Sequence, residues 1–180
     1  MQKQNNLTNL IIHPKDPTSA FMSVIYEDMP NYTLVDKFIG ISELRSLIES
    51  HDRVVMVGHG SPNGLFDIER GGYLIDSRYV DVLKEKTDNI YIWCNADVFV
   101  ERYDLKGFYT GMIISEVCEA LYCNVTPSDL MVMESNEMFA KSIHEGIKYT
   151  PQLIVESVNK TYDTIGNDVV DYNKVNIYHR

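Results

Sequence analysis

Apolar and amphipathic stretches take turns along the chain, and this pattern predicts alternating strands and helices. The stretches 52–60 and 89–97 contain almost continuous apolar runs, which are typical of strands that a parallel sheet buries on both faces. Further strands are expected at 7–14 and 31–38, with a last edge strand at 173–180.

Helices are expected where apolar residues recur on one side at helical spacing. In the stretch 41–50 the recurring residues are Ile41, Leu44, Leu47 and Ile48. The other predicted helices cover 16–29, 76–87, 135–149 and 151–163. Gly71 and Gly72, between two short apolar pieces of 65–76, predict the turn of a hairpin.

Two stretches fit the alternation less simply. The segment 111–123 is interpreted as a strand that runs into a helix. The segment 95–110 is the longest expected loop, and long loops in compact domains are often functional.

Strands that alternate with helices predict an α/β fold, a three-layer sandwich with a mostly parallel central sheet. The chain of 180 residues fits a single domain over 1–180, with a helical C-terminal part and the edge strand. In such sheets the carboxyl ends of the parallel strands collect along one edge, where ligands and chemistry gather.

Charge and composition limit the kinds of partner that the chain is expected to bind. The formal net charge is -10, so the surface repels phosphate groups, and neither nucleic acid nor an anionic membrane is an expected partner. No run reaches the roughly 18 apolar residues of a membrane span. The first residues lack the apolar core of a signal peptide, which favours a cytoplasmic location.

The three cysteines have to be considered one by one. Their odd number, without a CxxC pair or a zinc-like spacing with histidine, argues against a disulfide framework and against a metal site. Cys118 and Cys123 fall in an apolar helical stretch and are expected to be structural. Cys94 instead ends the predicted strand of 89–97.

Two consecutive buried strands end in residues that can react together. His59, between Gly58 and Gly60, ends one strand, and Cys94 ends the next. If these strands are neighbours, about 4.8 Å apart, both side chains reach the same rim, where an imidazole and a thiol can act as base and nucleophile. The glycine after the histidine exposes an amide that, with the amide of Cys94, could bind a developing oxyanion.

Each residue also has a simpler interpretation. Cys94 could be the last buried residue of a strand, because free cysteines are usually small buried hydrophobes. His59 could be an ordinary turn residue. The stretch 58–64 matches neither a nucleophile elbow nor a phosphate-binding glycine motif, although its amides could still cradle an anion.

The strand "VVMVGHG" that ends in His-Gly, followed by the strand "IYIWC" that ends in Cys, resembles the caspase-like cysteine peptidases, a group with caspases, metacaspases, legumains, gingipains, clostripain and CHAT domains. The expected order of strands and helices is similar too. The resemblance covers about 7–124. It implies a caspase-like fold and hydrolysis of a peptide bond through a thioester.

By this resemblance, Cys94 is the nucleophile, His59 the catalytic histidine and Gly60 the oxyanion-hole glycine. It implies a peptide or protein substrate and no cofactor or metal. Members select the side chain before the cut, so Asp97 and Glu101, just beyond Cys94, are proposed to offer a carboxylate to a basic side chain.

The chain also departs from the group's pattern, and this keeps two alternatives open. Trp93 precedes Cys94 where many members have a small residue, and Asn95 follows it where they have Ser-Gly or Gly. The first alternative is a non-catalytic domain of the same architecture that binds a partner or ligand. The second is a nucleotide- or phosphate-binding protein that uses the amides of 58–64. The pattern leaves the oligomeric state undecided.

Overall fold

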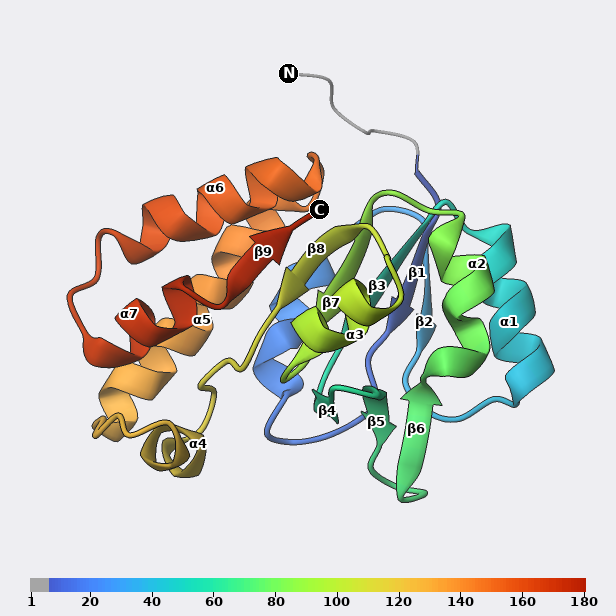
Figure 1. Cartoon of the computed structure of the whole chain (residues 1–180). Helices are drawn as coiled ribbons and strands as arrows, with labels where there is room; N and C mark the ends of the chain where they lie inside the picture. Colours follow the sequence, from blue (N-terminus) through green and yellow to red (C-terminus); the bar gives the residue numbers. More distant parts are fainter. Residues whose placement is uncertain (1–6) are drawn as a thin grey trace.

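Six strands form a central sheet in the computed structural model, which describes residues 7–180. They are β1 (Asn9–Ile12), β2 (Tyr32–Val35), β3 (Arg53–Val57), β7 (Asn89–Ile92), β8 (Gly107–Thr110) and β9 (Ile177–His179). Their order across the sheet is β2-β1-β3-β7-β8-β9; β9 pairs antiparallel with β8, and the other pairs are parallel (Figure 1). The predicted mostly parallel α/β sheet is therefore confirmed.

A small antiparallel sheet follows β3 directly. It consists of β4 (Gly60–Ser61), β5 (Gly64–Asp67) and β6 (Gly72–Ile75). Gly71 has a φ of 70°, a left-handed conformation that suits the turn between β5 and β6, so the hairpin predicted at Gly71 and Gly72 is confirmed. Figure 1 places this sheet at the end of the main sheet where β3 runs out.

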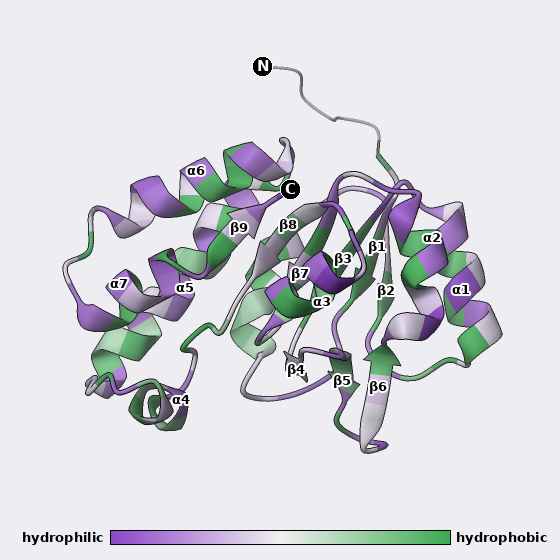
Figure 2. Cartoon of the chain, in the orientation of Figure 1, coloured by the Kyte–Doolittle hydropathy of each residue, from purple (hydrophilic) through white to green (hydrophobic). Residues whose placement is uncertain are grey.

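Helices cover both faces of the main sheet, which makes three layers. One face packs against α1 (Ile41–Ser50), α2 (Val80–Lys84) and α3 (Ala96–Arg102). The other packs against η1 (Ala20–Tyr26), α5 (Asp129–Gly146) and α6 (Pro151–Tyr162). The remaining helices are η2 (Ser77–Tyr79), α4 (Val117–Tyr122) and α7 (Asp168–Lys174). Figure 2 shows apolar strands in the middle and helices with mixed polar and apolar surfaces around them.

Successive side chains along each central strand point to opposite faces of the sheet, so each strand contributes to both hydrophobic cores. Val54 and Met56 of β3 face α1 and α2, whereas Val55 and Val57 face η1 and α5. All four side chains are fully buried. This two-sided burial explains why the sequence shows a continuous apolar run there instead of an alternating one.

Two expectations about the middle of the chain are wrong. The segment 95–110 is not a long loop, because it folds into α3 and β8. Phe99 and Val100 bury one side of α3, and Phe108 and Tyr109 are buried in β8. The segment 111–123 forms α4 only in its second half, and its first half contains no strand.

The helix predicted over 16–29 is a 3-10 helix, η1, and α7 was not predicted.

Within the described part of the chain, no helix combines the length and the apolar character that a membrane crossing requires.

The chain leaves β1 and β3 toward opposite faces of the sheet. The connection after β1 goes to η1 on one face, and the connection after β3 leads to α2 on the other. Because β1 and β3 are neighbours, their carboxyl ends diverge and form a topological switch point, the usual position of a ligand crevice in open α/β sheets.

The pairing of β3 with β7 is pinned at its amino end by the fully buried Asn89. Its Oδ1 accepts a hydrogen bond of 3.0 Å from the amide of Val54, and its Nδ2 donates to the Leu83 carbonyl at 3.2 Å and to the Tyr91 hydroxyl at 3.0 Å. One side chain therefore satisfies groups from β3, α2 and β7.

We expect Asn89→Ala to lower the free energy of unfolding by about 1–3 kcal/mol, because it leaves the buried Val54 amide without its acceptor. Urea denaturation would measure this loss. Asn63→Ala, which removes only an exposed contact with Arg102, is the control and should change stability by less than about 0.5 kcal/mol. Equal stability of the two variants would contradict the assigned role.

Candidate active site

The register of β3 and β7 brings His59 and Cys94 to the same level of the sheet. Val55 pairs with Ile90 and Val57 with Ile92. When this register is continued by two residues on each strand, His59 comes opposite Cys94. The Gly58 amide, which donates to the Ile92 carbonyl at 3.0 Å, extends the ladder one step past β3. The predicted neighbourhood of the two strands is therefore confirmed.

His59 and Cys94 line one small cavity on the face of the sheet covered by η1 and α5. Met22 and Phe139 close it from these two helices, and Ser115 closes it from the segment before α4. Its volume is about 20 Å³, room for about one water molecule. The two side chains thus share a compartment, and this compartment is closed to anything the size of a peptide.

The His59 ring is held by residues of the loop after β1. Its Nε2 lies 2.6 Å from the Thr18 hydroxyl oxygen and 3.5 Å from Asp16 Oδ1. The Thr18 hydroxyl donates its proton to Asp16. Since a hydroxyl has one proton, Nε2 must be the donor to Thr18, which leaves Nδ1 of the neutral ring as the basic nitrogen.

Asp16 supplies a negative charge behind this ring. The hydrogen bond from the Thr18 hydroxyl is the main reason that the pKa of Asp16 lies below its usual value, and the nearby His59 adds to the lowering. Asp16 is therefore ionised at neutral pH and places a negative charge 3.5 Å from His59 Nε2. This contact crosses the switch point between β1 and β3, where the fold predicts a site.

A tight turn presents Cys94. Asn95 has a φ of 64° and leads directly into α3, so the chain reverses right after the cysteine. Trp93 packs into the core on the α1, α2 and α3 face, and both Trp93 and Cys94 contribute to the lining of the small cavity.

The Cys94 sulfur faces oxygen atoms on its solvent side. Sγ lies 3.8 Å from the Ile113 carbonyl oxygen and 3.8 Å from Glu119 Oε1. Burial, followed by the charge of Glu119, raises the pKa of the Cys94 thiol to about 12. In this conformation the sulfur is therefore a protonated thiol at neutral pH, a poor nucleophile.

Gly60 has a structural role that the sequence did not reveal. A Cβ atom at this position would lie 2.3 Å from Trp93 Cδ1 and 2.6 Å from the Gly64 carbonyl oxygen. The Trp93 ring also donates from Nε1 to the Ser61 carbonyl at 3.1 Å. The absence of a side chain at Gly60 is thus what lets the indole pack under β4.

The two acids expected to bind substrate lie elsewhere. Asp97 and Glu101 belong to α3, on the other face of the sheet from Cys94, and their charges act on Tyr109 and Tyr178. Neither acid lines the cavity that holds His59 and Cys94. Burial, the largest cause, raises the pKa of Asp97, whose Oδ1 is buried without a hydrogen-bond partner.

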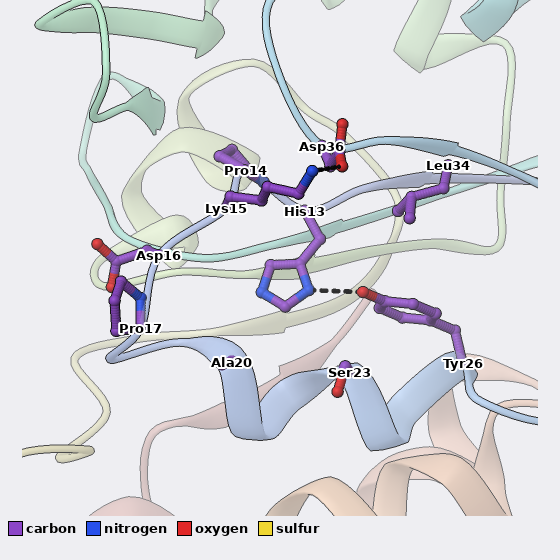
Figure 3. Close-up of a pocket in the computed structure, with 10 residues that line it drawn as sticks. All are labelled: His13, Pro14, Lys15, Asp16, Pro17, Ala20, Ser23, Tyr26, Leu34 and Asp36. Atoms are coloured by element: carbon purple, nitrogen blue, oxygen red, sulfur yellow. Dashed lines mark hydrogen bonds and ion pairs between the residues drawn. The ribbon is translucent and has the colours of Figure 1, made fainter.

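A larger cavity lies beside His59, at the carboxyl ends of β1 and β2. Its volume is about 420 Å³. Figure 3 shows the His13 ring reaching Tyr26 across the hollow, with Lys15 paired to Asp36 on its rim and Asp16 at one side. Because Asp16 also contacts His59, the large cavity and the small one are neighbours.

The other two cysteines differ from one another. Cys123 is partly buried and packs in a small cluster with α5 and α7, as expected for a structural residue. Cys118 is exposed on α4, so the expectation of a structural role is wrong for this residue. It faces solvent because the short α4 buries only one residue, Ala120.

Three residues of the site escaped the sequence reasoning. Asp16 and Thr18 fall at the start of the helix predicted over 16–29, and Glu119 falls in 111–123, where the sequence singles out no acid. The available signal was the position of Asp16 just after a buried strand at the switch point. Glu119 has no comparable signal, because its contact with Cys94 joins segments that no motif connects.

No protein-family model matches the chain, and no curated protein matches it. A solved structure of the Salmonella typhimurium RcsB response regulator, described in terms of conformational dynamism for DNA interaction, is similar over 93% of this chain and 98% of that chain. The identity is 10% and the TM-score 0.34, too low to support an argument about fold or function.

We expect Gly60→Ala to destabilise the fold by about 1–3 kcal/mol, because the new methyl group overlaps the Trp93 ring. Trp93 is the single tryptophan, so its fluorescence spectrum should shift as well. Gly72→Ala is the control, since a Cβ atom there meets nothing within 4 Å. An unchanged spectrum and urea midpoint in Gly60→Ala would refute this packing.

Proposed function

We propose that this chain is a cysteine peptidase with a caspase-like fold, in which Cys94 is the nucleophile and His59 the base. The observation that carries the proposal is the shared cavity of these two side chains at matching ends of β3 and β7. The contacts of His59 with Thr18 and Asp16 support it, because a catalytic base needs a partner that orients it.

The reaction begins when His59 Nδ1 takes the proton from Cys94 Sγ. The thiolate attacks the carbonyl carbon of the scissile peptide, and the amides of Gly60 and Cys94 stabilise the oxygen that becomes negative. His59 returns the proton to the leaving amine as the C–N bond breaks, which leaves a thioester on Cys94. Water, deprotonated by His59, then releases the acid and restores the thiol.

The cavity of about 420 Å³ beside Asp16 is the proposed place for a substrate side chain. Asp16 and Asp36 line it together with Lys15, so its net charge favours a basic side chain. This assignment replaces Asp97 and Glu101, which stand on the other face of the sheet. A peptide or protein substrate, no nucleic-acid or membrane partner, and a cytoplasmic location are part of the proposal and rest on the sequence.

One observation favours a second candidate function, a domain of this architecture that binds a partner without cleaving it. The raised pKa of the Cys94 thiol, which burial and Glu119 cause, leaves the nucleophile protonated in this conformation. A catalytic domain requires a conformation in which this environment changes. A binding module requires none, so the two functions differ in whether Cys94 ever reacts.

We expect the chain to cleave members of a fluorogenic peptide library, with basic residues before the cut preferred. Cys94→Ser and His59→Ala should each reduce kcat/KM at least about a hundredfold, since nucleophile and base act as a unit. Mass spectrometry of the reaction with a peptidyl acyloxymethyl ketone should find the inhibitor on Cys94.

Cys118→Ser is the matched control, because it removes an exposed thiol without touching the cavity. Cleavage that survives Cys94→Ser would refute the assignment. So would a complete lack of cleavage and of labelling in the chain and in its Glu119→Gln variant, and this result would favour the binding module.

A further inference from the structure

A single segment, 113–123, supplies both oxygen atoms that lie near the Cys94 sulfur. Ile113 and Ser115 line the small cavity, and the Ile113 carbonyl and the Glu119 carboxylate both lie 3.8 Å from Sγ. Helix α4 forms the second half of this segment. Figure 1 places α4 at the same end of the molecule as the loops that follow the parallel strands. The segment thus stands over the rim where substrate would enter.

The Glu119 carboxylate is held in position from within the segment. Its Oε2 accepts hydrogen bonds of 2.7 Å and 2.9 Å from the amide and hydroxyl of Ser115, and of 3.0 Å from the amide of Glu116. These bonds fix one oxygen and direct the other, Oε1, at the Cys94 sulfur. Because all the donors belong to the segment itself, Glu119 moves wherever α4 moves.

The anchors that tie the segment to the rest of the fold are concentrated at its beginning. The buried Asn173 side chain accepts from the Ile114 amide at 2.7 Å and donates to the Ile114 carbonyl at 2.9 Å. Asn136 donates from Nδ2 to the Ser115 carbonyl at 2.9 Å. Beyond Ser115 the segment is held by a side-chain hydrogen bond between Cys123 and Tyr172 of α7 and by packing of the small cluster around Ala120.

That packing is light. The third cluster has four buried residues, Ile114, Ala120, Val132 and Val169, far fewer than either core of the main sheet. On α4 itself, Leu121 is 59% and Tyr122 83% exposed. Segments with few buried apolar contacts open at low free-energy cost compared with the core, so α4 can leave while the sheet stays folded.

In the position that the structure shows, segment 113–123 prevents attack by the Cys94 sulfur on a peptide in two ways. A cavity of about 20 Å³ cannot hold the carbonyl group of a peptide next to the sulfur. The carboxylate also opposes the negative charge that the sulfur must acquire. The other titratable groups around Cys94 are His59 in the same cavity, Cys123 from the end of the segment and Tyr172 from α7.

We propose that segment 113–123 is an inhibitory strap, whose Glu119 carboxylate covers the Cys94 sulfur and must swing away with α4 before a substrate can reach it. The inference rests on the proposed role of Cys94 as nucleophile. The motion turns about Ser115 and keeps the Ile114 clamp on Asn173. It breaks the Asn136 contact, the hydrogen bond between Cys123 and Tyr172, and the packing of Ala120.

The test measures the reactivity of the thiols, which needs no substrate. The whole chain is alkylated with iodoacetamide between pH 7 and pH 9, and mass spectrometry gives the rate at each cysteine, with the exposed Cys118 as the internal reference. In the unmodified chain, Cys94 should react far more slowly than Cys118. In Glu119→Gln the rate at Cys94 should rise about tenfold for each unit by which its pKa falls.

Two further variants separate the effect of the Glu119 charge from the effect of the strap's position over Cys94. Glu116→Gln removes a carboxylate from the same segment that has no direct contact with the sulfur. Its amide oxygen can still accept the capping bond from the Glu119 amide, so the rate at Cys94 should stay unchanged. Asn136→Ala keeps Glu119 but loosens the strap at Ser115, and it should raise the rate at Cys94 several-fold. The melting temperature of each variant identifies any that fails to fold, in which case the Asn136→Ala result decides.

The proposal of a strap is refuted if Cys94 of the unmodified chain is alkylated as fast as Cys118. It is also refuted if neither Glu119→Gln nor Asn136→Ala raises the alkylation rate at Cys94. Failure of the peptidase proposal gives a different result. Faster alkylation in both variants without cleavage of any peptide would support a cover over Cys94 but refute the peptidase. Peptide cleavage together with unchanged alkylation rates would support the peptidase and refute the strap.

Discussion

The parallel pairing of β3 with β7 is the constraint on which the rest of the site depends. Asn89 fixes it at the amino end through the Val54 amide, and the Gly58 amide extends it at the carboxyl end to the Ile92 carbonyl. A shift of one residue would turn every side chain of β3 to the other face, exchange the two cores and move His59 away from the level of Cys94. The same register of β3 against β7 is therefore required both to pack the two cores and to place His59 level with Cys94.

The same alternation explains why a tryptophan can stand next to the proposed nucleophile. Trp93 fills the core on the α3 face, and the missing side chain at Gly60 gives its ring the space it needs. Cys94, one position on, faces the opposite layer under η1 and α5. Trp93 also contributes to the lining of the small cavity, so the departure from the small residue that many caspase-like peptidases carry at this position concerns both the core and the cavity.

The sequence predicted the parts of the molecule that periodicity encodes. Continuous apolar runs predicted β3 and β7, and their order predicted that His59 and Cys94 lie at one edge. Periodicity did not reveal β8, because the strand has only four residues and begins with Gly107. A Cβ atom at Gly107 would lie 2.0 Å from the Asn89 carbonyl oxygen, so a glycine is needed where β8 pairs with β7. Nor did it reveal Asp16, Thr18 and Glu119, because their contacts with the two reactive residues depend on how loops from distant segments meet.

The two carboxylates at the site act in opposite directions on one proton. Transfer of that proton from Cys94 to His59 creates a negative sulfur and a positive ring. In the proposed reaction Asp16 lies beside the ring that receives the proton, whereas Glu119, 3.8 Å from the sulfur, opposes the negative charge that the sulfur would acquire. Asp16 sits on the loop that follows a central strand, but Glu119 sits on a short and lightly packed helix. In the proposed mechanism the charge of Asp16 thus belongs to the loop after β1 and the charge of Glu119 to the proposed strap, so a movement of α4 would carry away the second of the two causes, burial and Glu119, that raise the pKa of the Cys94 thiol.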